Sequence, residues 1–459
     1  MNQQAFSSLK LHPNLLTNLS TLGYDAMTPI QQQSLPAILA DKDVIAQGQT
    51  GSGKTAAFGL GLLQKLNLKQ HGIQALVLCP TRELADQVAK EIRKLGRSIA
   101  NIKVLTLCGG MPFGPQVGSL EHDAHIIVGT PGRIEDHLSR GTMKLNGIST
   151  LVLDEADRML EMGFQNALDT IVAQIPKQRQ TLLFSATFPA KIESIAKKIM
   201  RKPLIVQVTS THDDSTIEQH FYRIEDDEQR MTALRLLLLK HRPESTLVFC
   251  NTKKETESVA QALTWHGFSA LALNGDLEQR DRDQTMVRFT NKSISILVAT
   301  DVAARGLDVA ALDAVINYHI AQDPETHVHR IGRTGRAGSK GIACSLYREN
   351  PYRMTMLGDY IGREIKGETL PSLELLKQDI FKPTMTTLQI GGGKKQKLRP
   401  GDILGALTGE HGIEGKQVGK IHLMDNWAYV AVHRDALKIA MKKLSEGQLK
   451  GRSFRVRQI

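Results

Sequence analysis

The run Gly48-Gln49-Thr50-Gly51-Ser52-Gly53-Lys54-Thr55 is the feature that most restricts how this 459-residue chain can fold. It matches the phosphate-binding loop GxxxxGK[ST], which requires a buried strand before it and a helix after it. Both requirements are met, because an apolar run at 43–46 precedes it and an Ala- and Leu-rich stretch follows. An ordinary glycine turn would not need this context. The pattern therefore predicts an α/β unit that binds a nucleotide.

Each part of the loop has an expected role. Gly51, Ser52 and Gly53 present backbone N–H groups to phosphates at a helix N-terminus. Lys54 is expected to reach the β- and γ-phosphates, and the Thr55 hydroxyl is expected to ligate Mg²⁺. The predicted cofactors are therefore ATP and Mg²⁺.

An acidic run, Asp154-Glu155-Ala156-Asp157, follows the apolar strand at 151–153. Its carboxylates should emerge at the carboxyl edge of the sheet, where ligands bind in α/β folds. Asp154 can hold Mg²⁺ through water, and Glu155 can orient and deprotonate the water that attacks the γ-phosphate. Alone, such a run is more often a helix N-terminus with favourable charge. Combined with the phosphate loop, it predicts ATP hydrolysis.

Apolar runs alternate with helical patterns in two series, one between about 40 and 205 and one from about 245 to 317. Short apolar runs separated by helices indicate buried parallel strands. The fold class predicted is α/β, with two parallel-sheet units followed by a small α+β domain. The expected boundaries are 1–208 for the first unit, 209–216 for a polar linker, 217–384 for the second unit and 385–459 for the last domain.

Charge and cysteine content narrow the partners and the compartment. The chain carries 58 Lys and Arg against 47 Asp and Glu, a net charge of +11. Residues 385–459 contribute 14 against 6, which leaves 44 against 41 elsewhere, so the excess lies in the last domain. Such a balance favours a polyanion such as nucleic acid as the partner.

Four separated cysteines indicate neither a zinc site nor disulfides, and no membrane span is expected. The predicted location is cytoplasmic.

The second unit lacks a phosphate loop but contains His329-Arg330-Ile331-Gly332-Arg333-Thr334-Gly335-Arg336. Closely spaced arginines repel one another unless an anion collects them. Arg333 and Arg336 could stabilise the charge that develops on a transferring phosphoryl group. In that case hydrolysis requires the two units to close. A solvated basic face or an RNA-binding patch is the alternative.

These motifs, in this order, resemble those of the DEAD-box RNA helicase family, from Phe6 to about residue 370. Further matches are Thr28-Pro29-Ile30-Gln31, Pro80-Thr81-Arg82-Glu83-Leu84-Ala85, Thr130-Pro131-Gly132-Arg133, Ser185-Ala186-Thr187 and Ala299-Thr300-Asp301. The resemblance implies two tandem RecA-like domains. Gly48 departs from the alanine usual in the family, with little expected consequence.

The resemblance also implies roles for individual residues. Gln31 would read the adenine and Phe6 would stack on it, while Asp301 would contact the ribose and Arg333 and Arg336 the γ-phosphate. Ser185, Thr187, Asp157 and His329 would couple the ATP and RNA sites. The RNA backbone would be contacted by Thr81, Arg82, Gly110, Thr130, Gly132 and Arg133 on the first unit and by Thr252, Gly275 and Thr300 on the second.

The last domain is predicted to have the order βαββαβ of an RRM-like fold, with strands at 387–390, 419–423, 427–433 and 453–456 and helices at 401–407 and 436–444. Trp427 and Tyr429 alternate on one strand and could stack bases, or could instead pack against the helicase core. Asp425 and Asn426 stand where the RNA-binding strand pattern expects Lys or Arg and Gly. Phosphate contacts are expected from Lys394, Lys395, Lys397 and Arg455.

A helicase core followed by such a basic domain resembles the DbpA-type branch of the family. This resemblance implies binding to large-subunit ribosomal RNA and action in ribosome assembly. The protein is expected to be a monomer. The function expected is an RNA-stimulated ATPase that locally unwinds RNA. The alternatives are a non-catalytic ATP-dependent RNA clamp or assembly scaffold, and a DNA helicase.

Overall fold

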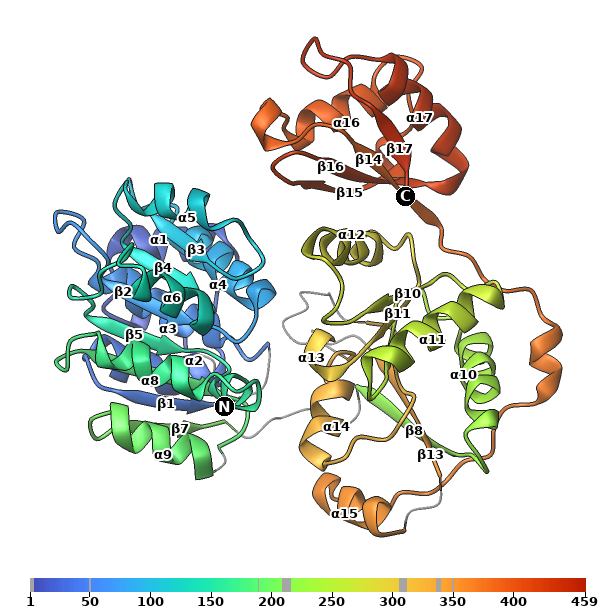
Figure 1. The fold of residues 1–459 in the computed structure, drawn as a ribbon, viewed down its shortest axis with the longest axis horizontal. Coiled ribbons are helices and arrows are strands. Elements are labelled where there is room, and N and C mark those ends of the chain that lie inside the picture. Colours follow the sequence, from blue (N-terminus) through green and yellow to red (C-terminus); the bar gives the residue numbers. More distant parts are fainter. Residues whose placement is uncertain are drawn as a thin grey trace. The chain divides into compact units, whose positions relative to one another are not determined.

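The computed structural model of the chain describes residues 4–48, 51–188, 190–208, 216–304, 312–335, 340–348 and 351–459. These residues form two compact units, one up to residue 208 and one from residue 216 onward. Each unit contains a parallel sheet, and the second also contains a smaller antiparallel sheet (Figure 1). Most of the predicted linker lies outside the described residues.

The first unit alternates strands and helices as the sequence pattern predicts. Its strands are β1 (Val44–Gln47), β2 (Ala75–Leu78), β3 (Val104–Leu107), β4 (Ile126–Gly129), β5 (Thr150–Leu153), β6 (Gln180–Ser185) and β7 (Leu204–Gln207). Its helices are the 3-10 turn η1 (Phe6–Ser8), α1 (Pro13–Thr21), α2 (Pro29–Leu39), α3 (Lys54–Lys65), α4 (Arg82–Leu95), α5 (Phe113–Leu120), α6 (Pro131–Ser139), α7 (Ala156–Glu161), α8 (Gln165–Ala173) and α9 (Ala190–Ile199). The strands form one parallel sheet in the order β3-β4-β2-β5-β6-β1-β7.

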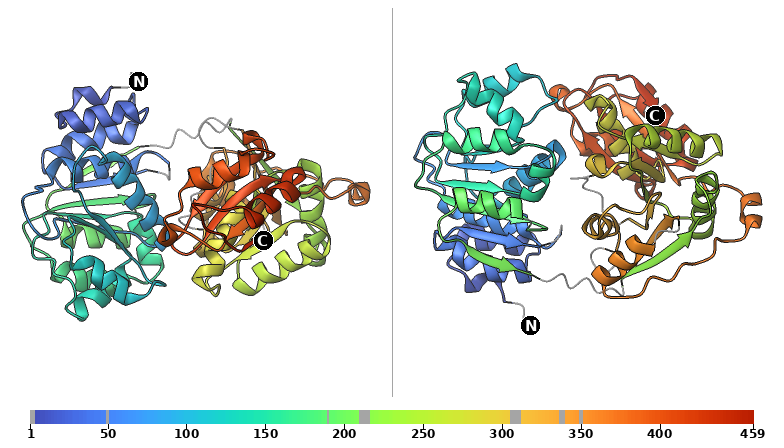
Figure 2. Two further views of the ribbon diagram at one scale, coloured as in Figure 1. Left: turned by 90° about the horizontal axis from the view of Figure 1, so that it is seen from above. Right: turned by 60° about the horizontal axis from the view of Figure 1, so that its bottom comes forward.

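Helices cover both faces of this sheet, as Figure 2 shows. Alternate residues of β2 point to opposite sides, so Val77 packs with α3 and α4 while Leu76 and Leu78 pack with α6 and α8. Each fully buried aliphatic side chain contributes roughly 1.5–3 kcal/mol, which explains why these strands are apolar throughout. The polar residues of the motifs are consequently displaced to the loops at the strand ends.

The second unit repeats the same topology. Its strands are β8 (Ile217–Arg223), β9 (Thr246–Phe249), β10 (Ala270–Leu273), β11 (Ile296–Ala299), β12 (Ala314–Asn317) and β13 (Gly341–Tyr347). Its helices are α10 (Glu228–His241), α11 (Lys253–Trp265), α12 (Gln279–Thr290), α13 (Asp301–Ala304), α14 (Pro324–Ile331), α15 (Pro351–Ile361) and the 3-10 turn η2 (Leu373–Lys377). All pairings are parallel, in the order β10-β11-β9-β12-β13-β8. With strands numbered from the start of each unit, both sheets share the order 3-4-2-5-6-1.

The last domain has the predicted order βαββαβ. Its elements are β14 (Met385–Ile390), η3 (Lys394–Gln396), α16 (Pro400–Thr408), η4 (Gly415–Gln417), β15 (Val418–Leu423), β16 (Ala428–His433), η5 (Arg434–Ala436), α17 (Leu437–Glu446) and β17 (Val456–Gln458). The antiparallel sheet has the order β15-β16-β14-β17, and one face packs on α16 and α17.

The position expected for the last strand is wrong. The sequence pattern places it at 453–456, whereas β17 begins at Val456. The register with β14 pairs Ile390 with Val456 and Leu388 with Gln458, while Phe454 instead packs against the domain core. The apolar Phe454, which precedes the strand, therefore led the sequence pattern to place the strand too early.

Candidate ATP and RNA sites

The phosphate loop lies where β1 leads into α3. Gly53 caps α3 with a φ of +94°, a left-handed conformation that favours glycine, and Gly51 has a φ of +87°. Lys54 is buried, and its ammonium donates to the carbonyl of Gly48 at 2.7 Å. Ser52 and Thr55 are half-buried beside it. The N-terminus of α3 thus carries the groups needed to hold a triphosphate.

Gln31 supports this loop from the side. Its side-chain nitrogen donates to the Gly53 carbonyl at 3.1 Å, and its oxygen accepts from the Thr28 backbone N–H at 2.8 Å. A Cβ on Gly53 would lie 2.5 Å from the Gln31 nitrogen, so a larger residue at this position would displace the Gln31 amide. The residue expected to read adenine is therefore also joined directly to the phosphate loop. Phe6 is buried, with its ring edge against Tyr24 at 6.2 Å between centroids.

The acidic run follows β5, as expected. Asp154 is 2% exposed and accepts a hydrogen bond from the Glu155 N–H at 3.0 Å. Burial raises the pKa of Asp154 to about 7, although the nearby Lys54 opposes this shift. Glu155 is half-buried and caps α7 with a φ of +52°, which is unusual for a residue other than glycine. Backbone strain of this kind is common at functional sites.

Asp157 joins the acidic run to the segment after β6. One of its carboxylate oxygens accepts from both the N–H and the hydroxyl of Thr187, each at 3.0 Å. The Asp157 N–H in turn donates to the Ser185 hydroxyl at 3.4 Å. The structure thus brings together the three first-unit residues expected to couple the two sites.

The expected RNA contacts of the first unit lie along the other half of the same sheet edge. Thr81 follows β2, Gly110 follows β3 and Thr130 follows β4. The two threonines cap α4 and α6, which point their N-termini toward this edge. Gly132 is the second residue of α6. Helix N-termini and hydroxyls suit contacts to phosphate oxygens.

Arginines flank this row of helix N-termini. Arg82 begins α4, with its guanidinium 3.9 Å from the Asp86 carboxylate. Arg133 donates to the Met111 carbonyl at 3.0 Å and lies over the Phe113 ring. These contacts fix both guanidinium groups beside the edge that carries Gly110.

The second unit has an equivalent row after β9, β10 and β11. Thr252 caps α11 and accepts from the Glu255 N–H at 3.2 Å, and Thr300 accepts from the Ala303 N–H at 3.3 Å. Gly275 lies beside Lys253, since a Cβ there would be 3.5 Å from the lysine side chain. All three residues are at the carboxyl edge of their sheet.

Asp301, expected to contact the ribose, is paired with an arginine that sequence reasoning left without a role. Arg330 donates to the two carboxylate oxygens of Asp301 at 2.7 and 2.8 Å and to the His319 carbonyl at 2.8 Å. Its side chain is only 3% exposed. A paired geometry of this kind is among the strongest ionic hydrogen bonds in proteins. Arg330 therefore positions Asp301.

The remaining groups of this motif lie at or after the end of α14. His329 is half-buried on that helix, and Arg333 is half-buried two residues past its end. The Arg333 carbonyl accepts from the Leu312 N–H at 3.2 Å, which anchors the backbone at the amino end of β12. Arg336 lies outside the described residues.

The aromatic pair of the last domain faces the second unit's helix α12. The Arg280 guanidinium lies 4.6 Å from the Trp427 ring centroid, and Tyr429 is 2% exposed. On the same face Thr387 bonds Asn291 at 3.1 Å and Ser293 at 2.7 Å. Packing against the helicase core, one of the two alternatives, is what this structure contains. Base stacking by Trp427 and Tyr429 stays a prediction.

The basic loop of the last domain is held rigidly. The backbone N–H groups of Lys394 and Lys395 donate to the carbonyls of Met424 and Asp425, both at 2.9 Å. A Cβ on Gly393 would lie 2.3 Å from the Met424 carbonyl, so only glycine permits this contact. The Lys394, Lys395 and Lys397 side chains are exposed, as is Arg455. The loop thus presents its cations to solvent.

The donor set at the phosphate loop fits a magnesium ion that arrives with a nucleotide. Mg²⁺ in such sites is bound by one or two protein groups, phosphate oxygens and waters. The buried Asp154 carboxylate and the Thr55 hydroxyl are groups of this kind. No cluster of three or more His, Cys, Asp or Glu side chains suited to a metal occurs among the described residues.

Every helix that the described residues form is too short or too polar to cross a bilayer.

Comparisons with known proteins agree with these features. Three family models match the chain: DEAD/DEAH box helicase over residues 28–195, helicase conserved C-terminal domain over 229–338, and DbpA RNA binding domain over 387–458. The chain is 53% identical over 455 residues to the ATP-dependent RNA helicase DbpA of Escherichia coli (strain K12), covering 99% of each chain. It is 39% identical to the DEAD-box ATP-dependent RNA helicase CshA of Bacillus subtilis, covering 95% of this chain and 85% of that one.

Solved structures are similar as well. S. cerevisiae Dbp5 bound to RNA and ADP BeF3 matches with a TM-score of 0.72 and 31% identity, over 81% of this chain and 98% of that one. Mss116p bound to ssRNA and AMP-PNP matches with a TM-score of 0.73 and 27% identity, over 82% of this chain and 83% of that one. The chain therefore belongs to the DEAD-box family of ATP-dependent RNA helicases and ends in a DbpA-type RNA-binding domain.

Proposed function

We propose that the protein is an RNA-stimulated ATPase that opens short RNA duplexes on large-subunit ribosomal RNA during ribosome assembly. The observation that carries the proposal is the similarity to a DbpA helicase along the whole chain, including the basic C-terminal domain. The resemblance to the DbpA-type branch implies recognition of a ribosomal RNA hairpin by that domain. Its net charge of +8 suits an RNA partner. The protein would act as a monomer.

In this proposal the first unit holds the nucleotide. Gln31 reads the adenine, Phe6 stacks on it, and Gly51, Ser52, Gly53 and Lys54 hold the phosphates. Phe6 would first have to leave its buried position beside Tyr24. Thr55 and Asp154 would hold Mg²⁺, which supplies charge neutralisation of the phosphates when bound. Glu155 takes the proton of the attacking water.

The second unit completes the cycle. Asp301, positioned by Arg330, contacts the ribose, and Arg333 and Arg336 stabilise the charge that develops on the γ-phosphate. The threonines and glycines at the two sheet edges hold the RNA backbone without reading its sequence. Asp157, Ser185, Thr187 and His329 make nucleotide and RNA binding interdependent. Hydrolysis then releases the RNA.

A steady-state ATPase assay tests the proposal. Turnover should be low with protein alone and should rise strongly with a ribosomal RNA fragment. Absence of stimulation by any RNA would favour the non-catalytic clamp. Equal stimulation by single-stranded DNA, which lacks the 2′-hydroxyl, would favour a DNA helicase.

Binding of a Mg²⁺ nucleotide complex is expected to release protons near neutral pH. In the nucleotide-free protein Asp154 has a pKa of about 7, and a cation requires its ionised form. The affinity should therefore rise with pH from about 6 to 8 and level off above. At pH 6.5 calorimetry in buffers of different protonation enthalpy should detect release of more than about half a proton. Asp154→Asn titrated with the same complex is the control, because the nucleotide then contributes equally to both titrations. Equal release from both proteins would contradict the assignment of Asp154.

The exposed lysines of the basic loop are expected to carry much of the salt-dependent RNA affinity. Replacing Lys394, Lys395 and Lys397 together with Ala should weaken binding of a ribosomal RNA fragment and reduce the slope of log affinity against log salt by about two to three, because fewer counterions are released. Filter binding at several salt concentrations measures this slope.

A matched triple variant separates local contacts from net charge. Lys416, Lys438 and Lys442 are also exposed in this domain but lie outside the basic loop. Their replacement with Ala changes the charge equally and should alter the slope much less. Equal effects of the two triple variants would show that the loop has no special role.

A further inference from the structure

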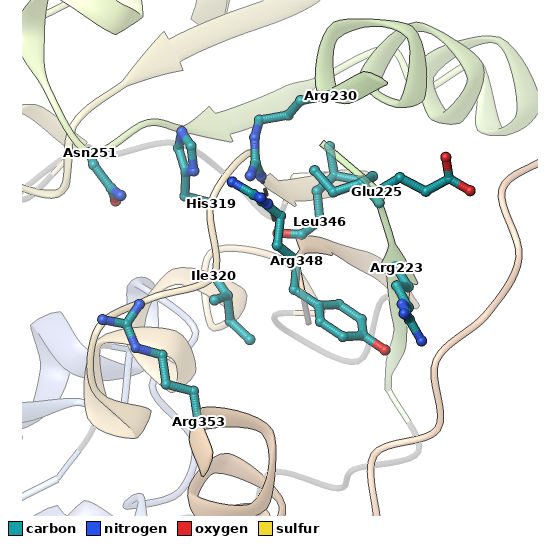
Figure 3. A pocket seen from close by; sticks show the side chains of 11 residues that line it. Arg223, Glu225, Arg230, Asn251, His319, Ile320, Leu346, Arg348 and Arg353 are labelled. Atoms are coloured by element: carbon teal, nitrogen blue, oxygen red, sulfur yellow. Dashed lines mark hydrogen bonds between the residues drawn. The ribbon is translucent and has the colours of Figure 1, made fainter. Parts of the chain in front are cut away.

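A cavity opens at the carboxyl edge of the second parallel sheet. None of the residues assigned to ATP or RNA lines it, although Asn251 in its wall directly precedes Thr252. It has a volume of about 550 Å³ and lies after β8, β12 and β13. Pockets of this size hold nucleotide-sized ligands. Figure 3 shows that its lining side chains come from several elements, with Arg230, Arg348 and Arg353 among them.

The position of the cavity corresponds to that of the nucleotide site in the first unit. Because both sheets have the strand order 3-4-2-5-6-1, β8, β12 and β13 are the counterparts of β1, β5 and β6. In the first unit the ends of those three strands carry the phosphate loop, Asp154 and Ser185. The cavity is therefore the second unit's equivalent of the ATP pocket.

The groups that line the cavity are suited to an anion. The charged residues that line it are four arginines, Arg223, Arg230, Arg348 and Arg353, and one glutamate, Glu225. Arg230 is 4% exposed and is fixed by Asp227 at 2.7 Å, while Arg348 lies 3.6 Å from the same carboxylate. The other three arginines are exposed at the rim. Clustered guanidinium groups favour phosphate because they can donate paired hydrogen bonds.

The cavity lacks the groups that make the first site an ATPase. The loop from β8 to α10 is Ile224-Glu225-Asp226-Asp227, with no glycine and no lysine. Acidic side chains at the start of α10 would repel a phosphate placed there. A phosphate group must instead lie against the arginines at the end of β8, directly after β13 and on α15. The apolar wall of Ile320 and Tyr347 can pack against a base or sugar.

We propose that this cavity is a second, non-hydrolytic site for a nucleoside phosphate, held by Arg223, Arg348 and Arg353. Such a ligand could be a free nucleotide or a nucleotide of an RNA strand, since both offer the same phosphate and base. The site belongs to the second unit, whereas the phosphate loop belongs to the first.

Binding to the full chain tests the proposal once the first site has been weakened by Lys54→Ala. Isothermal titration with ADP, without Mg²⁺, should reveal one remaining site. Adding Arg348→Ala and Arg353→Ala should weaken this site by about tenfold or more, because two charge-assisted contacts are lost. Both side chains are exposed, so the fold should be retained, which circular dichroism can verify.

The matched control adds Lys366→Ala and Lys377→Ala instead, which remove two exposed cations of the same unit elsewhere. This control should leave the affinity of the remaining site for ADP unchanged.

A short single-stranded oligoribonucleotide distinguishes the two possible ligands, a free nucleotide and a nucleotide of an RNA strand. If the oligoribonucleotide competes with ADP, and if this competition is lost in the arginine variant, the site accepts a nucleotide of an RNA strand. If ADP binds and the oligoribonucleotide does not compete, the ligand is a free nucleotide. No remaining site, or one that the arginine changes leave intact, would overturn the proposal.

Discussion

Replacing Glu155 with Gln is expected to lower RNA-stimulated ATP turnover by about a hundred- to ten-thousandfold. The substitution keeps the size and the hydrogen-bonding reach of the side chain but removes the base that takes the proton of the attacking water. The backbone at 155 already has a positive φ with a non-glycine residue, and Gln adds no further strain. ATP and RNA affinities should stay within a few-fold of those of the unmodified protein. Steady-state turnover and nucleotide binding, measured side by side, check both expectations.

A second acidic residue of the same helix provides the control. Glu161 lies at the far end of α7 and bonds Arg158 at 2.8 Å. Its replacement with Gln removes the same charge from the same helix and should leave turnover nearly unchanged. If Glu155→Gln hydrolyses ATP at the normal rate, Glu155 is not the base, and proton transfer must be assigned to another group near Asp154.

Local sequence patterns were sufficient for the parallel sheets and for most motif positions. Strands buried on both faces must be apolar along their whole length, and the polar motif residues then fall at their carboxyl ends. Thr81, Thr130 and Thr252, which the family resemblance singled out, each follow such a strand within three residues and cap the next helix. The βαββαβ order of the last domain followed from the same kind of periodicity.

Contacts between distant segments could not be predicted from these patterns. Arg330 belongs to a dense arginine motif. Nothing in the local sequence indicates that it pairs with the Asp301 carboxylate instead of a bound phosphate. Gln31 likewise shows no sequence sign of its bond to the Gly53 carbonyl. The arginines of the cavity come from four separate elements, so no motif contains them. Tertiary packing determines all three arrangements.

The faces of the C-terminal sheet show why a strand pattern alone leaves function open. Alternation places Tyr429 opposite the core-facing Val430, which suits either base stacking or a buried contact. Tertiary contacts, among them those of Thr387 with Asn291 and Ser293, show that this face packs against the region around the end of α12. The exposed lysines of the basic loop therefore become the stronger candidates for holding RNA.

Replacing Arg333 with Ala is expected to lower RNA-stimulated turnover by about a thousandfold or more, because an arginine supplied to the γ-phosphate stabilises charge that exists fully only in the transition state. ATP affinity should change little, since the groups proposed to hold the nucleotide lie mainly on the first unit. Arg333→Lys should recover little activity, because an ammonium cannot form the paired hydrogen bonds of a guanidinium. Single-turnover kinetics with saturating RNA separates this chemical defect from a binding defect.

Two further measurements make the result decisive. Lys366→Ala removes one exposed cation from the same unit and should leave turnover unchanged, which excludes a general charge effect. A non-hydrolysable ATP analogue should strengthen RNA binding to the unmodified protein but much less to Arg333→Ala, because the second unit then lacks its link to the nucleotide. Turnover within tenfold of normal, with the analogue effect intact, would mean that Arg333 does not reach the γ-phosphate. The proposed closing of the two units around ATP would then have to depend on other groups.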